Sequence, residues 1–229
     1  VYDLSSKFGC DVDTAAGLLR DIAAAGCEGG IAFHVGSQCG SPASYTTALA
    51  LVGHVIARSG QLPVVIDVGG GFPAHYAEAD VPRLEEFMRA IADGLSALGL
   101  PPETRILAEP GRALVADACS LLVQIQLRKD SALYLNDGVF GSLAEMALSS
   151  LRMPVRLLRR GASAVRESRA FTLYGPTCDG LDVLPGRFEL PADAREGDWL
   201  EIGQLGAYSN ALATRFNGFY PETWVTVES

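Results

Sequence analysis

Three consecutive glycines, Gly69, Gly70 and Gly71, end an apolar stretch and are followed by Phe72 and Pro73. Successive glycines let several backbone N–H groups converge on one anion, such as a phosphate group. A tight turn between a strand and a helix uses the same residues, and glycine motifs taken alone give many false positives. A phosphate cradle and a plain turn are therefore both open for this motif.

Glu109 and Arg112 flank a Pro110-Gly111 pair. Proline restricts one backbone dihedral angle and glycine frees the next, so the two charged side chains are held in a defined turn. The permanently charged guanidinium group of arginine suits a phosphate, and a glutamate carboxylate can pair with a protonated ring nitrogen. A local ion pair on the surface is the alternative interpretation.

His34 follows another apolar stretch and precedes Gly36 and Ser37. Its imidazole is a candidate base, ligand or stacking partner for a flat ring, and a structural histidine is the alternative. His54 lies in a helical pattern and His75 in a loop, so we expect structural roles for both. Histidines dispersed in this way predict no metal site.

Cys178 and Asp179 lie between Pro176 and Gly180, in a loop within a region otherwise rich in strand-forming residues. A cysteine beside an acid is a candidate acid or thiol catalyst. A buried thiol with no chemical role is the alternative.

Alternating strand and helix signals place the first three of these motifs. Apolar runs predict buried parallel strands at Gly30–Val35 and Leu62–Val68, and a third strand is predicted at Thr104–Ala108. The helical patterns are Asp11–Ala25, the stretch to Gly60 that starts with Ser41 as N-cap and Pro42 as first helical residue, and a stretch capped by Asp80. Repeated βα units favour a parallel sheet, doubly wound or closed into a barrel, whose functional groups gather at the carboxyl ends of the strands. We therefore expect the three motifs at one edge of the sheet.

The second half of the chain predicts a mostly β domain. Its strand signals are Leu133–Asn136, Phe171–Tyr174, Trp199–Ile202 and Trp224–Val227, and Asp137-Gly138 is a turn signal. Helical patterns are sparse there. We expect two domains, a β/α domain over residues 1–114 and a β domain over residues 115–229.

Composition and charge exclude several classes of protein. Hydrophobic residues make up 48% of the 229 residues and charged residues 20%, which argues against disorder. No run approaches the ~20 apolar residues of a membrane helix, and a net charge of −9 argues against nonspecific nucleic-acid binding. The five cysteines form no CxxC pair, so we expect no disulfide framework, no zinc site and, by default, a cytoplasmic protein. The chain begins at Val1 in strand-like sequence, and we expect it to be a fragment.

Taken together, these residues resemble the fold-type III amino-acid decarboxylases that depend on pyridoxal phosphate, and within them the ornithine decarboxylase group. Seven stretches carry the resemblance, in the family's order and across nearly the whole chain. They are Lys7-Phe8-Gly9, Phe33-His34-Val35-Gly36-Ser37, Asp67-Val68-Gly69-Gly70-Gly71-Phe72-Pro73, Glu109-Pro110-Gly111-Arg112, Asn136-Asp137-Gly138-Val139-Phe140-Gly141-Ser142, Gly175-Pro176-Thr177-Cys178-Asp179-Gly180-Leu181-Asp182, and Gly206-Ala207-Tyr208 through Phe216-Asn217-Gly218-Phe219.

The resemblance implies the C-terminal half of a (β/α)₈ TIM-type barrel, followed by a mostly β domain. It implies that His34 stacks on the cofactor ring and that Glu109 pairs with the ring nitrogen. The phosphate would be held by residues of four motifs: Ser37, Gly70, Gly71, Gly111, Arg112 and Tyr208. Cys178 would return a proton to the substrate, and Asp179 would bind the substrate's distal ammonium group. In this family those last two residues act in the partner subunit's site, so a homodimer is implied.

Two departures from the family pattern affect the expected activity. The only lysines are Lys7 and Lys129, and neither stands at the family's Schiff-base position. Eukaryotic members carry a Tyr-Asp pair where this chain has Leu148 and Ser149, with Glu145 as the nearby acid. Either Glu145 substitutes, or Asp179 acts alone, or the substrate is not ornithine.

The resemblance thus predicts decarboxylation of a basic amino acid with pyridoxal 5′-phosphate as cofactor. L-Ornithine, giving putrescine for polyamine biosynthesis, is the first expectation. The alternatives are a lysine or diaminopimelate-type decarboxylase and a non-catalytic regulatory homologue.

Overall fold

The computed structural model describes residues 5–76, 80–149, 151–161 and 163–227. The described residues form two compact units. Unit 1 contains those up to His75 and those from Asp80 to Leu114, and unit 2 contains Tyr76 and those from Val115 onward. The strand-like start at residues 1–4 lies outside the described residues.

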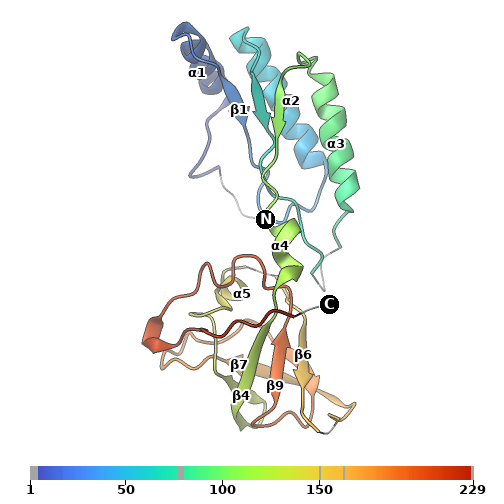
Figure 1. The fold of residues 1–229 in the computed structure, drawn as a ribbon, viewed down its shortest axis with the longest axis vertical. Coiled ribbons are helices and arrows are strands. Elements are labelled where there is room, and N and C mark those ends of the chain that lie inside the picture. Colours follow the sequence, from blue (N-terminus) through green and yellow to red (C-terminus); the bar gives the residue numbers. More distant parts are fainter. Residues whose placement is uncertain (1–4, 77–79, 150, 162, 228–229) are drawn as a thin grey trace. The chain divides into compact units, whose positions relative to one another are not determined.

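Unit 1 alternates helices with short parallel strands (Figure 1). The strands pair in the order β1-β2-β3, with Ile31 opposite Ile66 and Ile66 opposite Ile106. This arrangement confirms the predicted parallel β/α pattern over this part of the chain. The elements are α1 (Val12–Ala24), β1 (Gly30–Ala32), α2 (Ala43–Ser59), β2 (Val65–Asp67), α3 (Leu84–Ala97) and β3 (Arg105–Leu107).

The helix ends follow local capping rules, with two corrections to the predicted starts. The Asp11 side chain caps α1 by accepting the Thr14 N–H at 2.8 Å, as expected for an N-cap. The predicted Ser41 cap is wrong, because α2 begins at Ala43 with Pro42 as its N-cap and no side-chain cap. The predicted Asp80 cap is also wrong.

The start of α3 is set by residues that follow Asp80. Pro82 disfavours the helical conformation in the residue before it. The helix therefore begins at Leu84, and the Glu86 carboxylate accepts the N–H of the N-cap residue Arg83 at 3.0 Å.

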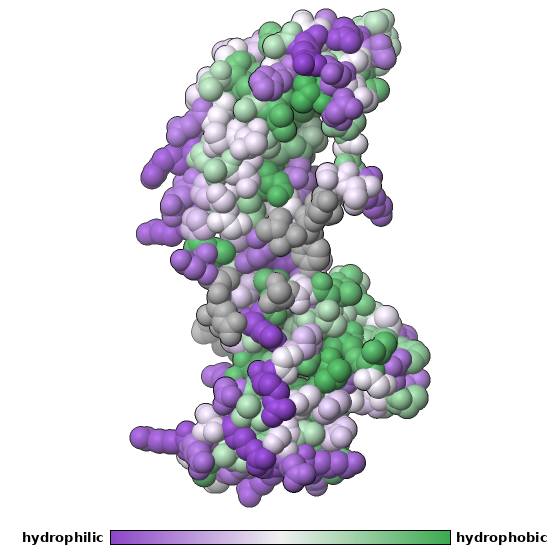
Figure 2. Space-filling view, turned by 180° about the vertical axis from the view of Figure 1, so that it is seen from behind, coloured by the Kyte–Doolittle hydropathy of each residue, from purple (hydrophilic) through white to green (hydrophobic). Residues whose placement is uncertain are grey.

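The core of unit 1 lies where α2 and α3 pack against the middle strand. Its fully buried members include Tyr45, Ile66, Phe72 and Phe87. The prediction of a buried strand is wrong for β1, in which Gly30 and Ala32 are exposed, and the residues of β3 are also all exposed, with Ile106 at 44%. These are the two edge strands of the three-stranded sheet, and the described residues leave their side chains largely uncovered. Hydrophobic side chains are visible on the surface of both units (Figure 2).

Unit 2 is built on a six-stranded, mostly antiparallel sheet in the order β6-β9-β4-β5-β7-β8. Its core is formed by fully buried side chains that include Phe171, Leu133 and Leu200. The short helix α4 (Arg112–Val115) contains the boundary between the units. The other elements are η1 (Ala116–Ala118), β4 (Leu121–Lys129), β5 (Ala132–Leu135), α5 (Ala144–Leu148), β6 (Val155–Leu158), β7 (Ser168–Tyr174), β8 (Phe188–Pro191), β9 (Trp199–Ile202) and η2 (Phe216–Gly218).

The predicted strands at 133–136, 171–174 and 199–202 are present in this sheet, and the one at Trp224–Val227 is not. That segment forms no strand, and Trp224 and Val227 are 66% and 86% exposed. Strand-forming residue types are insufficient where no neighbouring strand supplies hydrogen-bond partners. Within the described ranges, no helix has both the length and the apolar character needed to cross a bilayer.

Candidate active site

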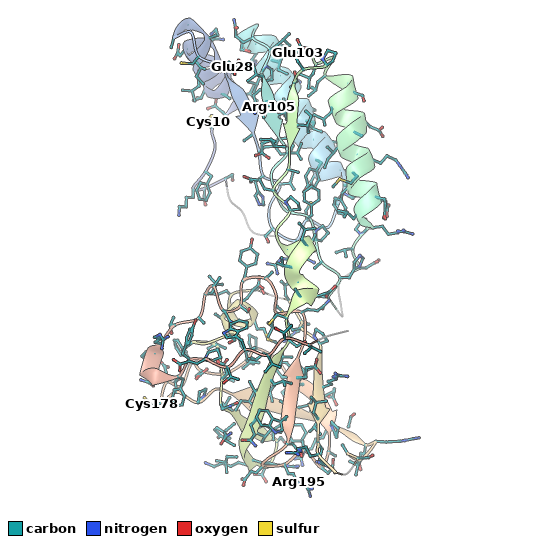
Figure 3. The ribbon with its side chains drawn as sticks, viewed as in Figure 1. Cys10, Glu28, Glu103, Arg105, Cys178 and Arg195 are labelled. Atoms are coloured by element: carbon teal, nitrogen blue, oxygen red, sulfur yellow. The ribbon has the colours of Figure 1, made fainter. Side chains whose placement is uncertain are left out.

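The three motifs of unit 1 meet at the carboxyl edge of its sheet, as the alternation of strands and helices predicts. The N–H of Glu109 donates to the Gly69 carbonyl at 2.8 Å, and the N–H of Phe33 donates to the Asp67 carbonyl at 3.1 Å. These bonds continue the strand pairing beyond the ends of β1, β2 and β3. Glu28, Glu103 and Arg105 lie at the opposite end, where β1 and β3 begin (Figure 3).

The turn formed by Gly69, Gly70 and Gly71, called the glycine turn below, packs tightly against the segment that follows β1 and the segment that follows β3. A Cβ atom on Gly70 would lie 2.8 Å from the Glu109 carbonyl oxygen and 3.2 Å from Nε2 of His34. A Cβ atom on Gly71, whose φ is +103°, would lie 2.5 Å from the Gly36 carbonyl oxygen. The close approach of three strand ends therefore requires glycine here.

The carbonyl groups of the glycine turn all point back into the protein. The Gly69 carbonyl accepts from the Glu109 N–H, the Gly70 carbonyl from the Tyr45 hydroxyl at 2.9 Å, and the Gly71 carbonyl from the Cys39 N–H at 2.8 Å. Among the described residues, the N–H groups of Gly70 and Gly71 have no hydrogen-bond acceptor. Gly70 is buried and Gly71 half-buried, so this pair of N–H groups requires an acceptor from outside the described protein.

Arg112 and Ser37 lie together, although 75 positions separate them in the chain. The guanidinium group of Arg112 donates to Oγ of Ser37 at 3.4 Å. Arg112 is 4% exposed, so its charge is held in the interior of the turn rather than spread over the surface. Gly111, one residue earlier, has no atom within 4 Å of where its Cβ would lie.

The His34 ring is held by its own loop. Its Nδ1 accepts the N–H of Gly36 at 3.0 Å. In a neutral imidazole the hydrogen is then on Nε2, the atom nearest Gly70. Both His34 and Glu109 are exposed, so a ligand can reach them from the carboxyl edge of the sheet.

Sequence reasoning missed two residues that support this edge. The amide of Gln38 bridges the His34 and glycine loops, because its Nε2 donates to the Ala74 carbonyl at 2.7 Å and its Oε1 accepts the Ala74 N–H at 3.1 Å. The second residue is Tyr45 on α2, whose hydroxyl donates a hydrogen bond to the Gly70 carbonyl. The position of Gln38 directly after Ser37 is the only local signal, and the apolar surroundings of Tyr45 provide none.

In unit 2, Cys178 and Asp179 lie in a loop that is held together by hydrogen bonds between its own residues. The Gly175 N–H donates to the Asp182 carbonyl at 2.8 Å, and the Asp179 carboxylate accepts the Leu181 N–H at 2.9 Å. Cys178 is exposed and lies on the surface beside η2 (Figure 3). Its N–H and its thiol are both directed at Oδ1 of Asn217.

A buried carboxylate ties this loop to a second one. One oxygen of Asp182 accepts from the N–H and hydroxyl of Thr177 at 3.0 and 2.7 Å, and the other accepts the Val139 N–H at 2.9 Å. Asp137 lies nearby, and burial raises the pKa of its carboxyl above the usual value, against the hydrogen bonds from Ser142 and Gly138. The predicted turn at Asp137-Gly138 is therefore a side-chain-capped loop that leads into α5.

The remaining predicted residues also lie in unit 2. Tyr208 is 48% exposed and has a φ of +55°. Leu148 is 68% exposed, whereas Glu145 is only 3% exposed. The low exposure of Glu145 argues against its taking over substrate binding.

Comparison with known proteins identifies the family. Residues 3–116 match the family model described as pyridoxal-dependent decarboxylase, pyridoxal binding domain. The chain belongs to the fold-type III, pyridoxal-phosphate-dependent decarboxylases. Within this family it falls in the ornithine decarboxylase group.

Two curated members and one solved structure illustrate the likeness. The chain is 33% identical to the lysine/ornithine decarboxylase of Selenomonas ruminantium, over 96% of this chain and 56% of that protein. It is 34% identical to antizyme inhibitor 2 of Xenopus laevis, over 94% of this chain and 51% of that protein. The lysine/ornithine decarboxylase of Vibrio vulnificus complexed with putrescine matches with a TM-score of 0.81 and 32% identity, over 93% of this chain and 58% of that one. The chain spans about half the length of the curated relatives it matches.

The residues present fit the phosphate of this family's cofactor. The turn offers two N–H groups without an acceptor in the described protein, beside a buried guanidinium group and a serine hydroxyl. An anion supplies acceptors for N–H groups and opposite charge for arginine. Glycines leave no Cβ atoms that would keep such a group at a distance.

Proposed function

We propose that this protein takes part in the decarboxylation of a basic amino acid, with L-ornithine as the first candidate and putrescine as its product. The observation that carries the proposal is the contact of Arg112 with Ser37, beside the two N–H groups of the glycine turn for which the described residues supply no acceptor. It lies within the residues that match the pyridoxal-binding domain of the family.

Each group of the site has a defined task in this proposal. Ser37, Arg112 and the glycine turn bind the phosphate, with Gly111 giving it access and Tyr208 as a further ligand. His34 stacks on the ring, and Glu109 holds a proton at the ring nitrogen. The bound cofactor supplies an electron sink for the electron pair released when CO₂ leaves. Cys178 returns a proton to the substrate α-carbon, and Asp179 pairs with the distal ammonium group.

The proposed active form is a homodimer with shared sites. Cys178 and Asp179 of one subunit would serve the cofactor bound by unit 1 of the other. Unit 1, over residues 1–114, would form part of a (β/α)₈ barrel, and residues 115–229 would form the β domain. The support is the order of motifs and the likeness to decarboxylases across nearly the whole chain.

A decarboxylation assay tests the proposal. The full-length gene product is supplied with pyridoxal phosphate, and CO₂ release is measured from carboxyl-labelled ornithine, lysine, arginine and diaminopimelate. We expect release from ornithine, strongly reduced in Cys178→Ala and unchanged in Cys27→Ala, a matched substitution of another exposed cysteine. Release from none of the four substrates would overturn the proposal.

A regulatory homologue is the second candidate. Its support is the likeness to antizyme inhibitor 2, together with the fact that the only lysines are Lys7, which precedes α1, and Lys129, at the end of β4. A protein with this role would release no CO₂ from any of the four amino acids and would bind a protein regulator of decarboxylases. Measuring both properties on the same preparation distinguishes the two candidates.

A further inference from the structure

The hydroxyl group of Tyr45 is the only side-chain donor to the carbonyl groups of the glycine turn among the described residues. Tyr45 lies on α2 and is 0% exposed, and its hydroxyl donates to the Gly70 carbonyl at 2.9 Å. The neighbouring carbonyl groups of Gly69 and Gly71 accept from backbone N–H groups instead. The orientation of the Gly70–Gly71 peptide thus depends on one phenol that is remote in sequence.

This contact sets the direction of an N–H group. The peptide is trans, so the carbonyl of Gly70 and the N–H of Gly71 point in opposite directions. Because the carbonyl points at Tyr45 in the core, the Gly71 N–H points away from the core. Burial raises the pKa of Tyr45, so the phenol stays protonated and remains a donor.

We propose that Tyr45 is a positioning residue for the phosphate site: it holds the Gly70 carbonyl in the core and so aims the Gly71 N–H at the anion. The inference rests on the proposed function, because it assumes that the glycine turn receives the phosphate of the cofactor. Without the phenol hydroxyl, the Gly70 carbonyl loses its donor and is free to rotate toward the site. Its oxygen would then face the phosphate and repel it.

The substitution Tyr45→Phe isolates this effect. Phenylalanine keeps the ring that stacks on Phe72, with centroids 5.1 Å apart, and meets Phe87 edge-on, with centroids 6.0 Å apart. Only the hydroxyl is lost. Tyr134→Phe is the matched control, because Tyr134 stacks on Tyr174 in unit 2, outside the phosphate site.

The test measures phosphate binding on the full chain, independently of catalysis. Dissociation constants for inorganic phosphate and for pyridoxal phosphate are determined by calorimetry, and the ¹H–¹⁵N resonances of Gly70 and Gly71 are followed during a phosphate titration. We expect Tyr45→Phe to raise the dissociation constants of both ligands by about tenfold, which is the scale of one lost hydrogen bond to a buried group. Tyr134→Phe should bind as the wild type does. Binding of pyridoxal, which lacks the phosphate, should be equal in all three proteins.

A rescue variant separates positioning from folding. Replacing Tyr45 by 4-aminophenylalanine restores an N–H donor at the ring position of the hydroxyl and should recover most of the affinity. Equal phosphate affinity in the wild type and a folded Tyr45→Phe variant would overturn the inference and leave the proposed function standing. Should Tyr45→Phe not fold, unshifted Gly70 and Gly71 resonances in the phosphate-bound wild type would overturn it. A wild type that binds neither ligand would overturn both proposals.

Discussion

The thiol of Cys178 lies 3.3 Å from Oδ1 of Asn217, and the main-chain N–H of Cys178 donates to the same oxygen at 3.2 Å. Asn217 adopts a left-handed conformation with a φ of 54°, which asparagine tolerates better than most residues. Its segment is held in place because Thr214 donates from both its N–H and its hydroxyl to the Phe140 carbonyl. The candidate proton donor is therefore fixed by a residue 39 positions away.

Replacing Asn217 by glycine should free the thiol without straining the backbone, because glycine accepts a positive φ. Loss of one hydrogen bond, worth about 1 kcal/mol, corresponds to roughly fivefold faster alkylation of Cys178 by iodoacetamide. Peptide mass mapping measures the rate, with the exposed Cys10 of the same chain as internal reference. An unchanged ratio of the two rates would show that Asn217 does not restrain the thiol.

Replacing Gly70 by alanine should damage the site through crowding. The new methyl group would lie 2.8 Å from the Glu109 carbonyl oxygen and 3.2 Å from the His34 ring, so both must move. We expect a loss of about 1–3 kcal/mol in the free energy of unfolding and weaker binding of pyridoxal phosphate, measured by urea denaturation and calorimetry. Gly40→Ala is the control, since no atom lies within 4 Å of its added Cβ; similar losses in both variants would contradict the crowding argument.

Removing the charge of Arg159 should destabilise unit 2. Arg159 donates to both oxygens of Asp198 at 2.8 and 2.6 Å, and both side chains are buried. Arg159→Met leaves the Asp198 carboxylate buried without this partner, which costs about 3–5 kcal/mol in the free energy of unfolding. Arg58→Met removes an exposed pair with Asp13 and should cost at most about 1 kcal/mol. Urea denaturation of both variants checks the prediction, and equal losses would contradict it.

The contribution of Asp137 to the free energy of unfolding should decrease as the pH rises. Burial raises the pKa of its carboxyl, so the folded state binds the proton more tightly than the unfolded chain does. This contribution is complete below the unfolded pKa of about 4 and is lost as the pH rises through the folded pKa. Asp137→Asn keeps an acceptor oxygen for the N–H groups of Gly138 and Ser142 and carries no titrating proton.

We therefore expect Asp137→Asn to gain stability relative to the wild type as the pH is raised from about 4 toward neutral. Urea denaturation at a series of pH values gives the difference. The exposed Asp93→Asn serves as control. A constant difference between Asp137→Asn and wild type across this range would refute the assignment.

Many of the elements were predictable because they depend on local pattern. The apolar run before Gly69 and the helical spacing after Pro42 each indicate their element without knowledge of the rest of the chain. The exact starts were not predictable, as at Leu84, where Pro82 overrides the capping tendency of Asp80. Burial was also misjudged for β1, since whether an apolar strand is covered depends on its neighbours rather than on its own residues.

The meeting of the three unit 1 motifs at one edge of the sheet was predictable from the sequence, and the contacts of the individual side chains were not. His34, the glycines and Glu109 each follow a parallel strand, and the carboxyl ends of such strands share one edge by topology. The approach of Arg112 to Ser37, the phenol of Tyr45 on the Gly70 carbonyl and the restraint of Cys178 by Asn217 join residues between 25 and 75 positions apart. No local pattern encodes such pairs, because they arise only when side-chain packing brings separate elements together. Residue order thus specified the motifs and the alternation that aligns them, and three-dimensional packing alone settled which donors and acceptors meet.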